Sequence, residues 1–271
     1  MATHLKLKFI CVIGIILILA ACATVPITER RQLNLVPSAS MLSMSFQQYD
    51  QFLKEHKLSD DPEKTRMVKR VGGRIQEAVE QYFAEQGQSG RLANYDWEFN
   101  LVKNDQVNAW AMPGGKVVVY EGLLPVARNE TGLAVVMGHE VAHAVARHGN
   151  ERMSQGMLAQ FGSIALAQAM KDKPAQTQQL WMMAFGLGAQ VGVILPYSRL
   201  HESEADHLGL IFMAMAGYDP REAADFWERM AEKKGGKSPP EFLSTHPADK
   251  KRIENIKELL PEAMTYYQKT P

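Results

Sequence analysis

The sequence predicts a mainly helical α+β fold with one small β-sheet, and three observations predict it. Long stretches before and after the middle of the chain carry helix start and stop signals or helical spacing of apolar residues. Only the stretch from residue 97 to residue 120 reads as β-strands. The 271 residues are 46% hydrophobic and 22% charged, which is the composition of a globular protein with one sizeable domain or two small ones.

The strands are expected on both sides of a glycine turn. Residues 97–102 alternate between apolar and polar, and residues 116–120 are rich in valine, as strands are. Between them, residues 108–115 combine a short strand with the turn sequence Pro113-Gly114-Gly115.

Helices are expected before and after this sheet. Their predicted ranges are residues 41–56, 62–85, 131–148, 199–216, 220–232 and 247–260. Asp61 and Pro62 mark the start of the second helix. Residues 157–170 and 181–195 are apolar but short for membrane spans, so a pair of amphipathic helices that covers helix 131–148 is expected there.

The five residues from His139 to His143 have the pattern H-E-x-x-H. An α-helix turns by about 100° per residue, so the two histidines lie about 40° apart on one face and can reach one metal ion. Glu140 can act as the general base that takes a proton from water. Apolar neighbours favour a buried site over a charged surface helix. The sequence therefore predicts one zinc ion per chain, bound by His139 and His143, and hydrolysis of a peptide bond.

The third ligand is expected in the acidic segment from His201 to His207. In a helix, Glu202 and Asp206 share a face, so Glu202 can bind the metal while Asp206 accepts a hydrogen bond from a ligating imidazole. His201 and His207 lie about 100° and 140° from Glu202 around the helix, which makes them weaker candidates. The alternative is a solvated acidic face without a metal. Ala205 is expected to let this helix approach the H-E-x-x-H helix closely.

The strand over residues 116–120 is expected to be a sheet edge above the cleft. An extended peptide can add to such an edge through backbone hydrogen bonds, with little sequence preference. Gly114 and Gly115 fit this exposed edge and an ordinary hairpin turn equally well. The residues predicted to bind the substrate in this way are Val117, Val118, Val119 and Tyr120.

One further histidine has two interpretations. Pro247 forces His246 toward an extended backbone. His246 either precedes a helix that Ser244 or Thr245 caps, or it reaches the site. In the site it would stabilise the oxyanion or take the open zinc position in a resting state.

The N-terminus reads as an export signal. Two lysines precede an unbroken apolar run over residues 9–21, which is too short for a comfortable spanning helix. Small residues before Cys22 resemble a bacterial lipobox, and Cys22 is the only cysteine left once Cys11 is removed. We therefore expect a lipoprotein signal peptide over residues 1–21, acylation of Cys22, a tether over residues 22–40 and one peptidase domain over residues 41–271.

Four motifs stand in order along the chain: VNAWAMPGGKVVVYEGLL, GHEVAHAVARH, SRLHESEADHLGL and LSTHPADKKRI. Together they resemble the membrane-associated zinc metallopeptidases of the CAAX-prenyl-protease and HtpX type, and most of all the bacterial periplasmic lipoprotein members. The resemblance covers about residues 41–260. It implies a zincin-like (gluzincin) fold in which His139, His143 and Glu202 bind zinc and Glu140 is the base. In this fold Asp206 supports a zinc-binding histidine.

These observations predict a zinc-dependent endopeptidase of the bacterial envelope, lipid-anchored and facing the periplasm. Ala23, rather than aspartate, after the cysteine favours the outer membrane. The expected partners are unfolded or misassembled envelope proteins as substrates. The balance of 30 basic and 30 acidic residues argues against nucleic acid. The alternatives are a chaperone-like outer-membrane assembly factor with a latent or plugged zinc site and a zinc-dependent esterase or amidase.

Overall fold

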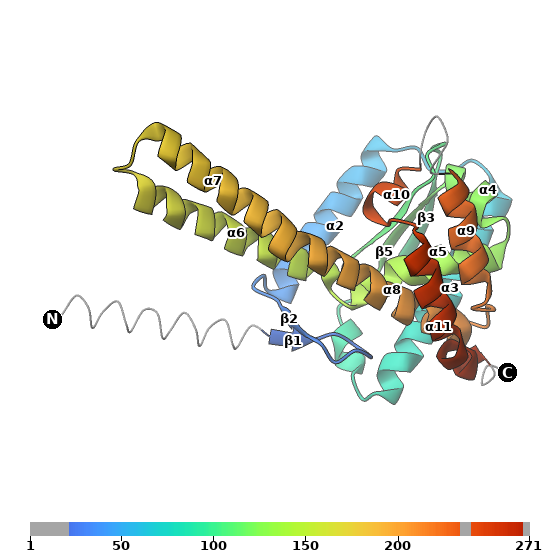
Figure 1. The fold of residues 1–271 in the computed structure, drawn as a ribbon. Coiled ribbons are helices and arrows are strands. Elements are labelled where there is room, and N and C mark those ends of the chain that lie inside the picture. The colour runs from blue at the N-terminus through green and yellow to red at the C-terminus, as the bar shows by residue number, and fades with distance from the viewer. Residues whose placement is uncertain (1–21, 234–239, 268–271) are drawn as a thin grey trace. The chain divides into compact units, whose positions relative to one another are not determined.

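A computed structural model describes residues 22–233 and 240–267, and the chain divides into two compact units (Figure 1). Of the described residues, the first unit comprises residues 22–41 and 147–200, and the second comprises residues 42–146, 201–233 and 240–267. The predicted signal peptide, residues 1–21, lies outside the described residues. One peptidase domain over residues 41–271 stays a prediction.

The second unit contains the predicted small sheet. Its strands are β3 (Glu98–Val102), β4 (Ala109–Met112) and β5 (Lys116–Tyr120), in the spatial order β3-β5-β4. β5 pairs parallel to β3 and antiparallel to β4. The β4–β5 connection is a tight hairpin, in which Gly114 and Gly115 adopt φ values of 90° and 85° that favour glycine. The hairpin explanation of these two glycines is confirmed.

The prediction that residues 116–120 form the sheet edge is wrong. β5 is the central strand, because the hairpin places β4 on one side and the parallel β3 occupies the other. The side chains predicted to bind the substrate are buried, and both edges of their strand are already paired, so a peptide cannot add there. These residues are Val117, Val118, Val119 and Tyr120. The outer edge of β3 is also taken, since Ser59 N donates to Leu101 O at 2.9 Å and Lys103 N donates to Lys57 O at 2.8 Å.

Helices cover both faces of this sheet. On one face, Tyr49 of α2 (Ser38–Glu55) packs with Val118 and Tyr120 of β5. On the other face, α3 (Pro62–Glu85) approaches β3 closely at Gly72, where a Cβ atom would lie 2.3 Å from the Phe99 ring. α5 (Glu130–Val145) packs against α3 and β4. The sheet therefore lies between α2 on one face and α3 and α5 on the other.

The remaining elements of the second unit are mostly helical, as predicted. They are a 3-10 turn (Ser89–Leu92), a second 3-10 turn (Glu121–Leu123), α4 (Leu124–Ala127), α9 (Glu222–Lys233), α10 (Phe242–Thr245) and α11 (Lys250–Tyr267). α8 (Leu195–Met215) begins in the first unit and continues in the second.

The helix predicted over residues 131–148 ends earlier, at Val145, and a second helix begins at His148. α5 ends at Val145, and α6 (His148–Met170) begins after Arg147, whose φ of 61° is left-handed and interrupts the helix. In the first unit, α6 and α7 (Ala175–Ala189) lie side by side as a hairpin, drawn in yellow in Figure 1. A π-helical turn (Gln190–Ile194) joins α7 to α8.

The predicted tether is partly ordered. β1 (Cys22–Thr24) pairs antiparallel with β2 (Arg31–Leu33). Within the same unit, Arg30 forms a bidentate ion pair with Glu151 at 2.7–2.9 Å. A role of this segment in tethering stays a prediction.

Candidate metal centre

α5 carries the H-E-x-x-H motif in the interior of the second unit. The side chain of Asn129 caps its start by accepting a hydrogen bond from Gly132 N at 2.9 Å. Every residue from Gly132 to Val145 is buried, because this helix is apolar on nearly all sides. His139, Glu140 and His143 are therefore polar groups held in an apolar interior, where each needs a polar partner.

α8 supplies the acidic side of the site. The backbones of α5 and α8 touch at Gly138 and Gly209: a Cβ on Gly138 would lie 2.9 Å from Gly209 O, and a Cβ on Gly209 would lie 2.9 Å from His139 N. The sequence predicts that Ala205 allows this approach. Ala205 is buried, but the close backbone contact lies at the two glycines.

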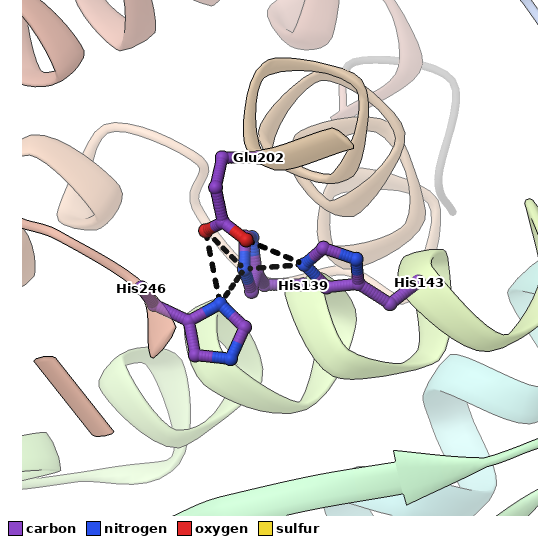
Figure 2. Close-up of side chains that lie close together, drawn as sticks. All are labelled: His139, His143, Glu202 and His246. Carbon is purple, nitrogen blue, oxygen red and sulfur yellow. Dashed lines mark hydrogen bonds and ion pairs between the residues drawn. The ribbon is translucent and has the colours of Figure 1, made fainter. Parts of the chain in front are cut away.

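Four side chains converge where these helices meet, as Figure 2 shows: His139, His143, Glu202 and His246. His139 Nε2 lies 3.1 Å from His143 Nε2 and 3.4 Å from Glu202 Oε2. His143 Nε2 lies 3.3 Å from Glu202 Oε1. The structure therefore brings together the three predicted zinc ligands from two helices that are about 60 residues apart in sequence.

His246 completes the cluster from a third element. It follows α10 at the point where Pro247 prevents continuation of the helix, and its ring stacks on Phe242 with centroids 4.4 Å apart. His246 Nδ1 lies 2.9 Å from Glu202 Oε2 and 3.1 Å from His139 Nε2. Its other nitrogen, Nε2, lies 3.3 Å from Glu140 Oε1. Of the two interpretations of His246, the structure supports a position in the site.

Asp206 holds His139 from behind. His139 Nδ1 lies 2.9 Å from Asp206 Oδ1, so the donated proton leaves the Nε2 lone pair directed at the cluster. Burial raises the pKa of Asp206, but the charge of Arg252 and the hydrogen bond from His139 lower it more, and the net pKa lies below its ordinary value. Burial also raises the pKa of Glu202, but its contacts with the surrounding histidines hold that pKa well below the ordinary range. Both carboxyl groups are therefore ionised.

Arg252 of α11 is a site residue that the sequence reasoning missed. Its Nε and Nη2 atoms donate to Asp206 Oδ2 and Oδ1 at 2.8 and 2.7 Å, and its Nη1 lies 3.2 Å from Glu202 Oε2. The guanidinium also lies 3.4 Å above the centre of the Trp227 ring, a cation–π contact. The available signal was its place in the motif LSTHPADKKRI, six residues after His246.

The donor set fits a divalent metal. A tetrahedral zinc ion with ligands at about 2.0–2.1 Å needs donor atoms about 3.3–3.4 Å apart. Five of the separations in the cluster are 2.9–3.4 Å, and its donor atoms all lie within 4.8 Å of one another. With the histidines neutral, as metal binding requires, the carboxylates of Glu140, Glu202 and Asp206 and the guanidinium of Arg252 sum to a charge of about −2. A divalent cation balances that charge.

Metal binding is coupled to a proton on His139. Burial lowers the pKa of His139, but the hydrogen bonds with Asp206 and Glu202 raise it more, to about 9. A metal at Nε2 has to displace the second proton of this ring. The rival histidine His207 is not in the cluster, since its Nε2 lies 2.9 Å from Glu262. His201 is likewise absent from the cluster of donor atoms among the described residues.

A mainly helical domain with a small sheet, an H-E-x-x-H helix and a glutamate from a later helix defines the class of zincin-like metallopeptidases. A sequence profile of peptidase family M48 matches residues 70–260. The chain belongs to peptidase family M48. Its predicted class, a metalloendopeptidase, and its predicted fold are thereby confirmed.

The chain is similar to several known proteases. It is 38% identical over 244 residues to "Mitochondrial metalloendopeptidase OMA1" of Schizosaccharomyces pombe, covering 88% of this chain and 66% of that protein. It is 30% identical over 244 residues to "Metalloendopeptidase OMA1, mitochondrial" of Homo sapiens, covering 88% and 46%. It is 29% identical over 181 residues to "Beta-barrel assembly-enhancing protease" of Escherichia coli, covering 59% and 34%. The chain thus spans two thirds or less of the length of these relatives.

The comparisons contradict the predicted location at the periplasmic face of a bacterial outer membrane. The relatives from Schizosaccharomyces pombe and Homo sapiens, which match 88% of the chain, are named as mitochondrial proteins. The lipobox-like residues before Cys22 form a short pattern of small side chains, which is weak beside a match of this length. The narrower resemblance to bacterial lipoprotein members is not supported either, and acylation of Cys22 stays a prediction.

Proposed function

We propose that this protein is a zinc-dependent endopeptidase that cleaves extended segments of unfolded or misassembled proteins. The convergence of His139, His143, Glu202 and His246 beside Glu140 is the observation that supports the proposal most directly. The names of the relatives, which describe a metalloendopeptidase and a protease, support the same reaction.

Zinc, when bound, supplies a Lewis acid that polarises the scissile carbonyl and acidifies water. The residues around it supply the proton chemistry. Glu140 Oε1 is buried and forms no hydrogen bond within the described residues, although His246 Nε2 lies 3.3 Å from it. It can take the proton of the attacking water and pass it to the leaving amine. Asp206 keeps His139 in the tautomer whose Nε2 faces the cluster.

The substrate would add to β4 rather than to β5. In the three-stranded sheet, β3 and β4 are the edge strands, and the outer side of β3 is taken by its bonds to Lys57 and Ser59, which leaves the outer side of β4. Tyr120 N donates to Asn108 O, so in this antiparallel register Ala109 and Ala111 direct their backbone groups away from β5. Ala109 N already bonds to Asn108 Oδ1. The N–H and C=O groups of Ala111, on the strand that packs against α5, are therefore the ones best placed to pair with an extended peptide.

A second candidate function is supported by one observation. His246 Nδ1 lies with the ligand atoms while its Nε2 lies near Glu140 Oε1. In this arrangement His246 would supply a fourth ligand to a bound zinc ion and would lie beside the base, which favours a latent peptidase that acts as an assembly factor. Opening of the site would then require His246 to move away.

The test is the Glu140→Gln variant, with casein cleavage and bound zinc as its two measurements. The proposal expects cleavage to fall at least about 1000-fold, because water loses its base, while zinc content stays at one ion per chain. The matched control is Glu77→Gln on the exposed face of α3, which changes the same chemical group far from the cluster and leaves cleavage unchanged.

The outcomes separate the two candidates. Loss of cleavage together with loss of cellular function in Glu140→Gln supports the endopeptidase. Full cellular function in that variant, with cleavage gone, supports the assembly factor. Unchanged casein cleavage in Glu140→Gln contradicts both the mechanism and the base assigned here.

A further inference from the structure

The α6–α7 hairpin of the first unit exposes an unusual amount of apolar surface. Large side chains along both helices are exposed; they are Leu158, Phe161 and Ile164 on α6, and Leu180, Trp181, Met183 and Leu187 on α7. The exposed fraction of Leu180 is 67% and that of Leu187 is 62%. The prediction of a helix pair that buries its apolar side chains over α5 is wrong, because an exposed surface of this size is not that of a packed pair.

Apolar residues surround α7 instead of forming one stripe. Leu180, Trp181 and Met182 are consecutive, so they point to three sides of the helix at steps of about 100°. A helix that is apolar on all sides is either the core of a protein or a membrane span. Burial excludes the first explanation here, since the most apolar window of the helix Ala175–Met215, with a mean hydropathy of 1.4, is not buried at all.

Charged residues are confined to the two ends of the hairpin. Residues 153–170 and 174–198 contain none. The tip carries Lys171, Asp172 and Lys173, and the base begins and ends with Arg152 and Arg199. At 1.5 Å per residue, 18 residues of helix extend about 27 Å, close to the roughly 30 Å of bilayer hydrocarbon.

The contact between the two helices is also of a kind that membranes favour. A Cβ atom on Gly162 of α6 would lie 2.7 Å from the Phe185 ring of α7, so the absence of a side chain permits the close packing. Farther along, an open apolar groove between the helices is lined by Leu158, Val193 and Ile194. An acyl chain fills such a groove without the cost of desolvating a polar group.

We propose that the α6–α7 hairpin inserts into a lipid bilayer and spans it, with the charged tip on the far side. A protein partner would cover one face, but lipid covers all sides, and the exposed residues are on all sides. A shallow insertion would leave Lys171, Asp172 and Lys173 in hydrocarbon, which is unfavourable for every charged side chain. This proposal does not depend on the proposed peptidase activity.

The first test uses the tryptophan that the hairpin itself carries. The full chain, with four tryptophans, is reconstituted into phosphatidylcholine vesicles with brominated acyl chains, beside the Trp181→Phe variant. We expect bromine to quench the emission of the unaltered chain and most of that quenching to vanish in Trp181→Phe. Equal fractional quenching in both proteins overturns the proposal. Anchoring by residues 9–21 alone would give this result, because that segment contains no tryptophan and Trp181 would stay outside the bilayer.

The second test places one charge at two depths. Leu187→Glu puts a carboxylate near the middle of the uncharged run 174–198. It should weaken insertion on the order of 100-fold. The matched control Gln176→Glu puts it near the tip and should change nothing. In sealed vesicles, external trypsin should spare Lys171 in the unaltered chain and in the control, and cut after it in Leu187→Glu; Lys173 is no trypsin site, because Pro174 follows it. Cleavage after Lys171 in the unaltered chain overturns the proposal, as does a dimer in vesicle-free buffer that Leu187→Glu dissociates without any quenching change.

Discussion

Arg252 binds both carboxylate oxygens of Asp206, through Nε to Oδ2 at 2.8 Å and through Nη2 to Oδ1 at 2.7 Å. The same Oδ1 atom lies 2.9 Å from His139 Nδ1. A chain of contacts therefore runs from α11 through α8 to the first histidine of α5. Arg252 is a positioning residue, since it acts on the candidate metal site through Asp206.

Replacement of this arginine should weaken zinc binding more than it weakens the fold. In Arg252→Met, the carboxylate of Asp206 loses its partner, and we expect zinc affinity to fall about 10- to 100-fold. Chelator competition measures the affinity, and thermal unfolding of the metal-free chain measures the fold. Arg252→Lys keeps the charge but not the two parallel bonds, so it should lie between the two. Equal zinc affinity in all three proteins would contradict the positioning role.

The contact of Gly138 with Gly209 predicts a stability effect with a matched control. In Gly138→Ala, the new Cβ meets Gly209 O at 2.9 Å, so α5 and α8 have to separate. We expect a loss of about 1–3 kcal/mol in the free energy of unfolding and weaker zinc binding. Gly73→Ala on α3 meets no atom within 4 Å and should be neutral or stabilise by about 0.5–1 kcal/mol. Urea unfolding checks both, and equal effects at the two sites would be inconsistent with the close contact.

The sequence predicted those parts of the site that depend on helical phase. His139, His143, Glu202 and Asp206 lie together in the structure, as expected from residues that are four apart in a helix and therefore share a face. His246 has two interpretations in the sequence, since it follows a short helix whose position depends on tertiary packing.

The parts that depend on how elements meet could not be predicted. The edge prediction for β5 fails because a valine-rich strand has the same pattern at the edge and in the centre of a sheet, and parallel pairing with β3 is a long-range contact. Gly138 and Gly209 gained meaning only once α5 and α8 were known to cross there. In the sequence, Arg252 is one of several charged residues in a polar motif, and only the fold shows its contacts with Asp206 and Trp227.

Tyr82 predicts how stability depends on alkaline pH. Burial raises the pKa of its phenol from the ordinary 10.0 to about 12, and nearby Tyr266 and Glu262 add to this. Between pH 10 and 12 the unfolded chain therefore loses the proton that the folded chain keeps, so stability present below pH 10 is lost as the pH rises through this range. In Tyr82→Phe this loss should be smaller. Urea unfolding at pH 9 and pH 11.5 compares the two proteins, and identical losses would contradict the prediction.

Ala111 tests the proposed peptide edge. Ala111→Pro removes the outward N–H of β4 and leaves the bonds between β4 and β5 in place. One lost hydrogen bond of about 1 kcal/mol predicts a KM for peptide substrates that is at least about fivefold higher. Ala111→Val keeps the N–H and should keep the KM. Steady-state cleavage with both variants checks this, and the proposal for β4 fails if the proline variant binds peptides as well as the valine variant does.

His246 distinguishes a blocking role from a catalytic one. Its Nδ1 lies 2.9 Å from Glu202 Oε2, among the donor atoms, and its Nε2 lies 3.3 Å from Glu140 Oε1. The two ring nitrogens of His246 contact Glu202 and Glu140, which hydrolysis needs. His246→Ala should therefore free the fourth coordination position of a bound zinc ion and remove the contact with the base Glu140. We expect faster peptide cleavage together with faster loss of zinc to a chelator, since the metal keeps three protein ligands instead of four. A fall in kcat with unchanged zinc release would instead assign His246 to stabilisation of the oxyanion.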